Sequence, residues 1–392
     1  MTDRSVADDG HFLFVVGTRP EFIKIRSVLL EIIRRKHRYR LIHSGQHYDY
    51  NMSAIFFKEL GLPEPDAFLE VGSDGPGGQT GEGLRKTEAV IAEHRPAAVV
   101  VQGDTNTTLF GALAAIKCGV PVAHIEAGVR SFDFTMPEEI NRRMVDAVAT
   151  FCFAPTARAL GNLTHEGRAE ASRLAGDTLV ETAGRIRDMA LKSSSILAQM
   201  NLQPCSYALV TSHRKENVDS PQRASAIAES LLQLDMPVVY PIHPRTRKMF
   251  SQFGLLEKLQ KRIRIVDPLG YFDFLSLLTQ ARIALTDSGG VQQEASIFHV
   301  PCLTLRNNTE WLETVEAGQN VLVGADTGRI VSEATRILSD AAVYDRMAKA
   351  PSPFQEGAAV RIVDALLAAL GGGRLTVPSS DFLKDGMPPL WN

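Results

Sequence analysis

The chain has 392 residues, more than one typical hydrophobic core requires, and this length predicts two domains. Hydrophobic residues make up 44% and charged residues 22%, as in ordinary globular proteins. The net charge of -3 argues against a broad basic surface for nucleic acid or an anionic membrane. Any phosphate binding must therefore come from a local site.

The cysteines and the chain start indicate where the protein resides. Its four cysteines are far apart, and no pair has metal-ligand spacing. We expect them to pack as small, reduced hydrophobes, in a reducing compartment. The first ten residues are polar and acidic, and no run reaches membrane-spanning length. The sequence thus predicts a cytoplasmic protein with no membrane partner.

In the first half, short apolar runs alternate with helical segments. Residues 12–16, Phe-Leu-Phe-Val-Val, are typical of a strand buried on both faces of a parallel sheet. Pro20 lies at a first-turn position, and apolar residues continue a helical face to about Arg35. We further expect strands at 39–43, 97–102, 120–125 and 150–153, the last closing this set, and helices at 51–60, 79–94, 106–118, 138–147 and 156–166. The repeated βα order predicts a parallel, doubly wound α/β sheet with right-handed crossovers.

A second series of the same kind follows. We expect its strands at 207–211, 238–241, 263–266, 283–286, 302–305 and 321–323. The last helix, at 358–370, is apolar on more than one side and should dock on another element. The predicted parts are a flexible start (1–10), a first domain (11–192), a serine-rich linker (193–206), a second domain (207–355), and a terminal helix with a loose tail (356–392).

The stretch 286–295, Thr-Asp-Ser-Gly-Gly-Val-Gln-Gln-Glu-Ala, is the most informative in the chain. A predicted strand ends here and a helix runs over 291–299, with Ser288 or Asp287 as its N-cap. Gly289 and Gly290 let backbone N–H groups approach a ligand, and a helix N-terminus favours phosphate. Glu294, one turn into the helix, is placed to accept from sugar hydroxyls. The alternative is an ordinary Gly-Gly turn with a capping serine.

Unusual polar residues follow the predicted strands in both halves. Ligands of open α/β sheets bind beyond the carboxyl ends of strands. Six such places on two sheets predict a cleft between two domains. The residues are Arg19, Asp104, Glu126, His213, His243 and the pair Asp287-Ser288.

The first domain supplies acids. Asp104 is a catalytic candidate, and the alternative is a cap for the following helix. Glu126 directly follows an apolar strand, where a carboxylate needs a partner; a salt bridge to Arg130 is the structural alternative. Glu138 and Glu139 begin a helix, where acids are favoured in any case.

The second domain supplies donors. Residues 212–215, Ser-His-Arg-Lys, place three potential cations in one loop, which suits a diphosphate. His243, between prolines, is either a ligand or a turn residue. Tyr271 and Phe274 are either core residues or a stacking surface for a base. Dinucleotide, P-loop, hydrolase-elbow and metal motifs are missing from the sequence. Acids opposite a diphosphate cradle favour proton abstraction or group transfer on a nucleotide sugar.

Eight motifs together resemble the UDP-N-acetylglucosamine 2-epimerase family, in order from about Phe12 to Asp326. They are Gly17-Thr-Arg-Pro-Glu, Gly45-Gln-His, Gln102-Gly-Asp-Thr, His124-Ile-Glu-Ala-Gly, Pro137-Glu-Glu-Ile-Asn-Arg, Ser212-His-Arg, His243-Pro and Asp287-Ser-Gly-Gly-Val-Gln-Gln-Glu. The resemblance implies two Rossmann-like domains of the glycosyltransferase-B type with an active site in the interdomain cleft. It also implies a last helix that crosses back to the first domain, no cofactor or metal, and a homodimer.

The resemblance assigns roles to particular residues. It implies a catalytic set of Asp104, Glu126, Glu138 and His213. It implies UDP-sugar binding, with Phe274 near the uracil, by Arg19, Lys24, His243, Phe274, Ser288, Gly289, Gly290, Glu294 and Arg306. The implied reaction interconverts UDP-GlcNAc and UDP-ManNAc, by anti elimination of UDP to a 2-acetamidoglucal and re-addition. One acid removes the C2 proton and another returns one on the opposite face; the sequence leaves open which acid serves which face.

Three departures from the family pattern affect the expected substrate. Gln293 stands where Glu is frequent, Trp311 stands where Arg is frequent, and 48–52, Tyr-Asp-Tyr-Asn-Met, differs from activator-binding members. These versions resemble archaeal-type members and the branch acting on UDP-2,3-diacetamido-2,3-dideoxyglucuronate. Trp311 either shapes the sugar pocket or packs the domain. Alternatives are epimerisation of that glucuronate, a hydrolysing epimerase releasing UDP and ManNAc, a glycosyltransferase, and a catalytically dead nucleotide-sugar sensor.

Overall fold

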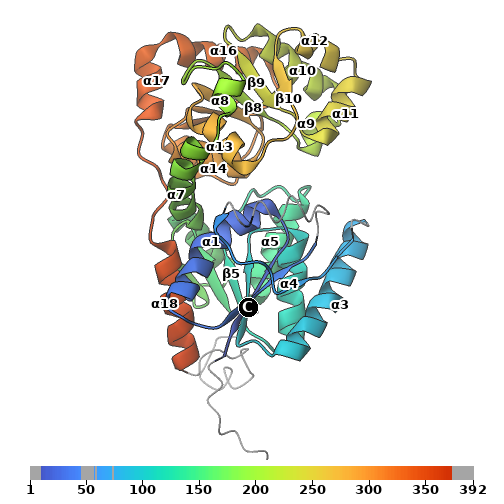
Figure 1. Ribbon diagram of the computed structural model, residues 1–392, viewed down its shortest axis with the longest axis vertical. Helices are drawn as coiled ribbons and strands as arrows, with labels where there is room; N and C mark the ends of the chain where they lie inside the picture. Colours follow the sequence, from blue (N-terminus) through green and yellow to red (C-terminus); the bar gives the residue numbers. More distant parts are fainter. Residues whose placement is uncertain (1–9, 46–56, 58–59, 73–74, 373–392) are drawn as a thin grey trace, which may run out of the picture. The chain divides into compact units, whose positions relative to one another are not determined.

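The computed structural model describes residues 10–45, 57, 60–72 and 75–372, which form two compact units (Figure 1). The first unit comprises the described residues up to 182 and from 355 onward, and the second comprises 183–354. Each contains one sheet, and the strand pairings of the described residues are all parallel. The predicted fold class, two doubly wound Rossmann-like domains of the glycosyltransferase-B type, is confirmed.

The first sheet has the order β3-β2-β1-β4-β5-β6-β7. β1 is buried at every position, as its continuous apolar sequence predicts. The order reverses between β1 and β4, so the turns after these two strands lie beside each other. The strands are β1 (Phe12–Val16), β2 (Tyr39–His43), β3 (Ala67–Phe68), β4 (Ala98–Gln102), β5 (Val122–Ile125), β6 (Phe151–Ala154) and β7 (Ser172–Leu174).

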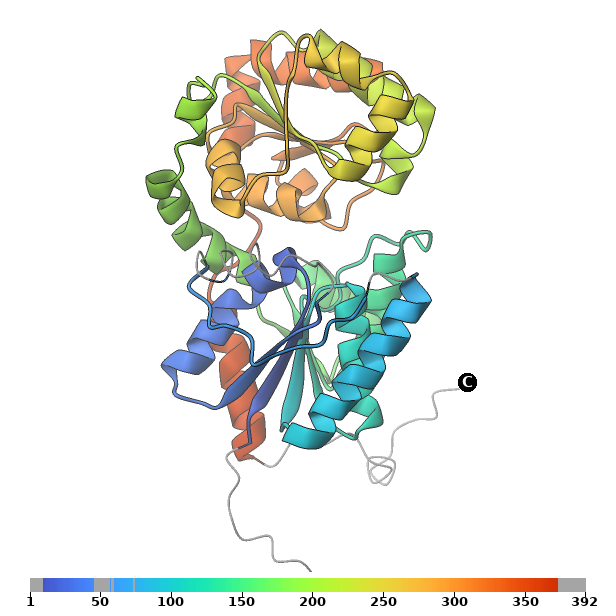
Figure 2. The same ribbon diagram turned by 45° about the vertical axis from the view of Figure 1, so that its right-hand side comes forward.

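Helices cover both faces of this sheet, with α1 and α18 side by side on one face and α3 and α4 on the other (Figures 1 and 2). α18 is fixed to α1 by an ion pair of 2.6 Å between Arg35 and Asp364. The described helices of the first unit are α1 (Arg19–Arg34), α3 (Pro76–His94), α4 (Asn106–Lys117), α5 (Pro137–Val148), α6 (Ala157–His165) and α18 (Ala358–Gly371); α7 (Thr178–Ser193) crosses the unit boundary.

The second sheet has the order β10-β9-β8-β11-β12-β13 and reverses between β8 and β11. Two apolar clusters cover its faces, one with α10, α11, α12, α16 and α17, the other with α8, α13 and α14. Alternate residues of β8 enter the two clusters, as a strand buried on both sides requires. The strands are β8 (Ala208–Thr211), β9 (Val238–Pro241), β10 (Arg264–Val266), β11 (Ile283–Thr286), β12 (Cys302–Thr304) and β13 (Asn320–Leu322).

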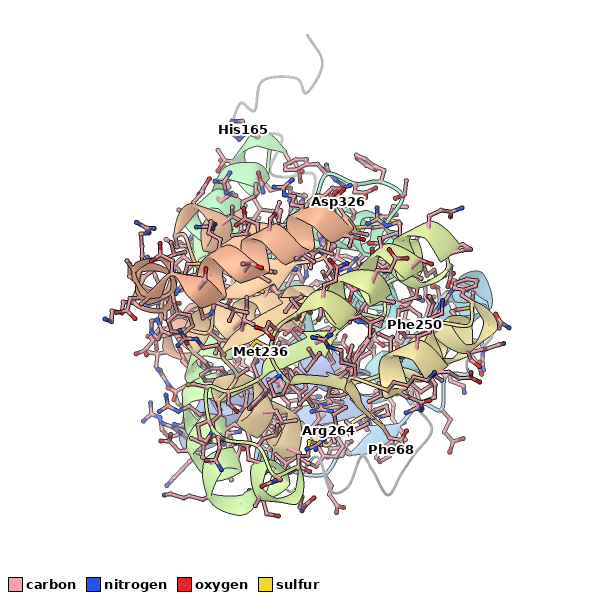
Figure 3. The ribbon with its side chains drawn as sticks, turned by 90° about the horizontal axis from the view of Figure 1, so that it is seen from above. Phe68, His165, Met236, Phe250, Arg264 and Asp326 are labelled. Carbon is pink, nitrogen blue, oxygen red and sulfur yellow. The ribbon has the colours of Figure 1, made fainter. Side chains whose placement is uncertain are left out.

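Figure 3 looks onto the second unit, with Phe250 on α11, Asp326 capping α16 and Arg264 beginning β10. The Asp326 side chain accepts from the Arg329 N–H at 2.7 Å, which satisfies one orphan donor of the first turn. The helices are α8 (Ile196–Gln199), α9 (Lys215–Val218), α10 (Pro221–Gln233), α11 (Pro244–Gln252), α12 (Leu256–Gln260), α13 (Tyr271–Thr279), α14 (Gly289–Ile297), α15 (Leu312–Glu316), α16 (Thr327–Ser339) and α17 (Ala341–Ala348).

The structure departs from the expected organisation in three places. The strand at 150–153 does not close the first set, because β7 follows it at the sheet edge. β3 and β7 were not predicted, since two or three residues are too short for a periodic pattern. The unit boundary falls within α7, and the stretch 193–206 belongs to the second unit, where Ile196 and Met200 join its core.

Some expectations fall on parts that the structure does not describe. They are the start before residue 10, most of the helix at 51–60, the Gln-His motif after Gly45, the segment 48–52 and the tail beyond 372. Among the described helices, none combines the length and apolar character that crossing a membrane requires.

Candidate active site

In the first unit a buried carboxylate joins the turns after β1 and β4. Glu21, 1% exposed, accepts from the backbone N–H groups of Gly17 at 2.9 Å and Thr18 at 2.6 Å. Its other oxygen accepts from the hydroxyls of Thr105 at 2.8 Å and Thr108 at 3.2 Å. Burial raises the pKa of Glu21, while these hydrogen bonds oppose the rise. Glu21 therefore fixes both turns at the point where the strand order reverses.

Gly17 is required here because the two turns approach so closely. A Cβ at this position would lie 1.9 Å from Ser44 Oγ and 2.4 Å from Thr107 Oγ1. Those hydroxyls bond each other at 3.0 Å. Arg19, the first residue of α1, follows directly and is half-buried. The Gly-Thr-Arg motif therefore fixes the position at which α1 begins.

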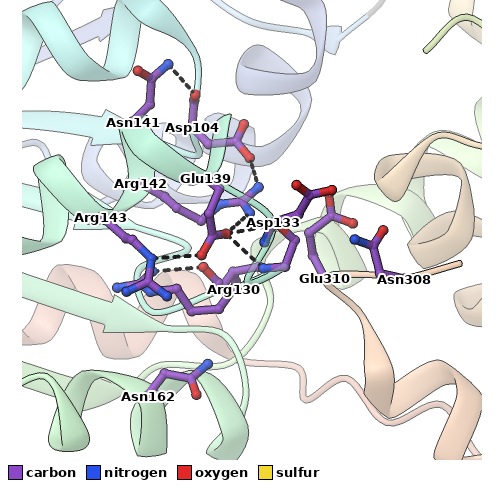
Figure 4. A network of polar contacts seen from close by, with 12 residues as sticks. Asp104, Arg130, Asp133, Glu139, Asn141, Arg142, Arg143, Asn162, Asn308 and Glu310 are labelled. Carbon is purple, nitrogen blue, oxygen red and sulfur yellow. Dashed lines mark hydrogen bonds and ion pairs between the residues drawn. The ribbon is translucent and has the colours of Figure 1, made fainter. Parts of the chain in front are cut away.

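Asp104 is paired rather than used as a helix cap. Its carboxylate forms an ion pair with Arg142 of α5, and its carbonyl accepts from Asn141 at 2.9 Å (Figure 4). The N-cap of α4 is Thr105, whose hydroxyl accepts from the Thr108 N–H at 3.3 Å. The capping alternative for Asp104 is therefore wrong. The Asp104 side chain keeps 30% exposure, so solvent or a ligand can reach it.

A network of alternating charges supports this aspartate (Figure 4). Its members are mostly buried, and every carboxylate in it contacts at least one cation, which offsets the cost of burial. It runs from Asp104 through Arg142, Glu139, Arg143, Glu166, Arg130, Asp146 and His124, whose Nε2 lies 2.8 Å from the carbonyl of Gly103. The network thus starts and ends at the turn after β4, and holds that turn from both sides.

Glu126 lies at the end of β5 and contacts two neighbouring elements. It pairs with Lys24 of α1 and accepts from Gln102 Nε2 at 3.2 Å. Burial raises the pKa of Glu126 to about 7, with Lys24 opposing the rise and Asp177 and Asp104 adding to it. The proposed salt bridge to Arg130 is wrong, since that side chain binds Asp146 and Glu166 instead.

The backbone at Glu126 is itself unusual. Its φ of 69° lies in the left-handed region, which a residue with a long side chain rarely adopts. Such strain persists only where surrounding contacts impose it, and it concentrates at functional sites. A carboxyl that titrates near neutral pH on a strained strand end has the character of a general acid or base.

The adjacent acids at the start of α5 have different surroundings. Glu139 is fully buried and binds the Ser131 N–H at 2.8 Å as well as Arg142 and Arg143. Glu138 is half-buried, and no hydrogen bond or ion pair between described residues engages its carboxylate. Glu139 is therefore structural, which leaves Glu138 available for chemistry. Glu138 lies one helical turn before Arg142, on the same face of α5.

In the second unit Asp287 holds the turns after β8 and β11 together. It is fully buried and accepts from Ser212 Oγ at 2.8 Å, the Arg214 N–H at 3.1 Å and Asn217 Nδ2 at 3.0 Å. His213 contacts it through both backbone and ring. The two histidine candidates lie together, with ring centroids of His213 and His243 5.9 Å apart.

The N-terminus of α14 has the backbone geometry that an anion site requires. Ser288 occupies the N-cap position, with no side-chain cap, and its own N–H bonds Thr286 Oγ1 at 3.0 Å. Gly289 and Gly290 are the first helical residues, so their N–H groups have no intrahelical acceptor. Glu294, 5% exposed, accepts from the Tyr271 hydroxyl at 2.8 Å.

The remaining candidates are partly or wholly engaged within the second unit. Arg306, 1% exposed, binds Glu310 at 2.7 Å, and Arg214 binds the same carboxylate at 3.1 Å. Arg214 is thus committed to the protein in this structure rather than held in an open loop. Phe274 is half-buried and packs against the apolar cluster of α13 and α14, while Tyr271 is core.

Trp311 packs inside the second unit. It is 3% exposed and meets Phe354 edge to face at a centroid distance of 5.5 Å. Its indole Nε1 would lie 3.3 Å from a Cβ at Gly289, so it also adjoins the start of α14. The packing alternative is what the contacts favour.

We therefore expect Trp311→Arg to lower the free energy of unfolding by about 3 kcal/mol or more, because a large buried ring is lost and a guanidinium is buried. Chemical denaturation measures this. Trp311→Phe is the matched control, since it keeps the contact with Phe354. An unchanged denaturation midpoint in Trp311→Arg, with altered preference among UDP-sugars, would instead assign Trp311 to the sugar pocket.

Within the described ranges, no group of three or more His, Cys, Asp or Glu side chains could hold a metal ion. The described cysteines are all unpaired thiols.

Comparison with known proteins decides the family. The model of the family described as UDP-N-acetylglucosamine 2-epimerase matches residues 31–367. The chain belongs to this family. It is 44% identical over 326 residues to the Methanocaldococcus jannaschii UDP-N-acetylglucosamine 2-epimerase, covering 81% of this chain and 89% of that one.

Two further members of the epimerase family extend the comparison. The Pseudomonas aeruginosa UDP-2,3-diacetamido-2,3-dideoxy-D-glucuronate 2-epimerase is 44% identical over 329 residues, covering 82% of this chain and 90% of that one. The crystal structure of the M. jannaschii enzyme in complex with UDP-GlcNAc and UDP matches with a TM-score of 0.85 and 42% identity, covering 91% of this chain and 99% of that one.

The epimerase motifs alone did not reveal the supporting residues. Arg142 ends the Pro-Glu-Glu-Ile-Asn-Arg motif, and its spacing of four from Glu138 was an available signal. The sequence marks Asp287 as a possible cap and as one of the polar residues after strands, but not its partners, although a carboxylate directly after a buried strand requires them. Glu21 and Tyr271 were identifiable only once their neighbours were known.

Proposed function

We propose that this protein is a non-hydrolysing UDP-N-acetylglucosamine 2-epimerase that interconverts UDP-GlcNAc and UDP-ManNAc. The main support is that a relative 42% identical over most of the chain was crystallised with UDP-GlcNAc and UDP. The first unit supplies the acids Asp104, Glu126 and Glu138, and the second supplies His213, His243 and the start of α14. Lys24, in this proposal, acts through Glu126.

The chemistry follows from these groups. One acid takes the C2 proton as the C1–O bond to UDP breaks, which gives a 2-acetamidoglucal and UDP. Donors at the start of α14 and on His213 stabilise the charge on the departing diphosphate. UDP then returns to C1 while a second acid protonates C2 on the opposite face. The charge of Asp104 adds to the raised pKa of Glu126, as expected for acids at one reacting centre.

Running the reaction in D2O tests this proposal. An acid that a solvent molecule can reach exchanges its proton before C2 is protonated again, so deuterium should appear at C2 of the epimer while UDP stays attached. NMR of the sugar protons and of the phosphorus nuclei measures both. Release of UDP in step with free ManNAc would identify a hydrolysing enzyme. Product that keeps protium at C2 through complete turnover would contradict elimination and re-addition.

One observation favours a second substrate. The relative that is named for UDP-2,3-diacetamido-2,3-dideoxy-D-glucuronate is as similar to this chain, at 44%, as the one named for UDP-N-acetylglucosamine. Parallel assays with both UDP-sugars decide between them through the ratio of kcat/KM values.

The proposal includes a cytoplasmic homodimer that supplies precursors for polysaccharide or glycoconjugate synthesis. Its supports are the family resemblance and the reduced cysteines expected from the sequence. Light scattering of the purified protein measures the oligomeric state.

A further inference from the structure

Asp287 is surrounded by donors only. Its two oxygens accept from the Ser212 hydroxyl, the N–H groups of His213 and Arg214 and the Asn217 amide, and Oδ1 also lies 3.2 Å from Nδ1 of the His213 ring. Burial would raise the pKa of Asp287, but the hydrogen bond and charge of His213, then the bonds of Asn217 and Ser212, hold it below its usual value. An ionised, fully buried carboxylate therefore lies immediately before the N-terminus of α14.

The His213 ring meets the Asp287 carboxylate through one of its two nitrogens. Nδ1 lies 3.2 Å from Asp287 Oδ1, while the side chain remains 45% exposed. In the described residues no hydrogen bond or ion pair engages Nε2, which leaves that nitrogen available to a ligand. Among the described residues, the ring contacts Asp287 and lies 5.9 Å, between centroids, from the ring of His243; Arg214 donates to the Asp287 carbonyl at 2.9 Å.

We propose that Asp287 is a positioning residue for His213: it holds one ring proton on Nδ1, so that the proton which the charged ring donates to the diphosphate of the UDP-sugar lies on Nε2. A carboxylate can only accept, so Nδ1 must donate. Rotation of the ring would remove this contact with the carboxylate. The same aspartate directly precedes Ser288 and the first N–H groups of α14 in the chain. This inference rests on the proposed function for the identity of the ligand.

NMR of the free protein tests the orientation without any substrate. Protein labelled with 15N-histidine should show, for neutral His213, a protonated Nδ1 and an unprotonated Nε2; His213→Asn identifies the signals by their loss. In Asp287→Asn the Nδ1 proton signal should exchange faster or disappear. Ser212→Ala removes another donor from Asp287 and should leave the His213 tautomer unchanged. A wild-type protein with the proton on Nε2 would overturn the proposal, even if the Asp287 variant failed to fold.

A double-mutant cycle tests the functional consequence. If Asp287 acts through His213, Asp287→Asn should lower kcat by roughly 10²-fold, as mispositioning of a reacting group does. In the His213→Asn background, the same change should cost less than about threefold more. Equal fold losses in both backgrounds, with correct folding by circular dichroism, would show a purely structural aspartate. If the wild type turned over no UDP-sugar, the proposed function would be contradicted. The NMR result would still test the pairing of Asp287 with His213.

Discussion

Glu126→Gln should lower kcat by roughly 10²-fold or more, as loss of a general acid or base does, while UDP binding stays nearly unchanged. The amide keeps the shape of the side chain and can still accept from Lys24, but it cannot take or return a proton at C2. Asp104→Asn should behave alike, because its side chain faces solvent while Arg142 anchors it. Steady-state kinetics and calorimetric UDP titration measure the two effects separately.

The matched control is Glu93→Gln, which removes a carboxylate on α3 with 74% side-chain exposure. It should leave both kcat and UDP affinity unchanged. If the Glu126 and Asp104 variants lost UDP affinity and kept turnover, the division of roles between the two units would be wrong.

Lys24→Met should change both the rate and its pH dependence. The proposed reaction needs one of the two acids protonated and the other ionised. The rate therefore falls at high pH when the acid with the higher pKa loses its proton, and that pKa sets the alkaline limb of the pH profile. For Glu126 that limb is expected near pH 7. Lys24 lowers this pKa, so its removal should move the alkaline limb to higher pH and raise the relative rate at pH values between the old limb and the new one. Profiles of kcat/KM between pH 5 and 10, recorded for both directions of the reaction, measure the shift of the alkaline limb.

Lys117→Met is the control, since it removes an exposed lysine at the end of α4. An alkaline limb that moved to lower pH in Lys24→Met would contradict the assignment of Lys24 as the partner of Glu126.

The pH dependence of stability tests the raised pKa of Glu126 independently. The folded pKa of Glu126 is above the usual 4.5, so this group stabilises the fold below pH 4.5, and the contribution is lost as pH rises through about 7. Glu126→Gln should remove that pH dependence.

The sequence by itself determined the two-sheet plan. Continuous apolar runs such as 12–16 and the alternation of strands and helices are local patterns, and they predicted most elements within a few residues. Motif order also identified the family, because residues such as Gly289 and Gly290 are recognisable without knowing their partners. The boundary between units was less predictable, because α7 passes through it without a break in helical pattern.

Only the tertiary structure decided how the candidate residues are paired. Glu126 binds Lys24, 102 residues away, rather than the nearby Arg130, and Asp104 binds Arg142, 38 residues away. Hydrophobic periodicity reports which face of an element is buried, but it carries no information on which strands become neighbours. The reversal of strand order places the turns after β1 and β4, and after β8 and β11, side by side, and only there do Glu21 and Asp287 find the donors that fix the site.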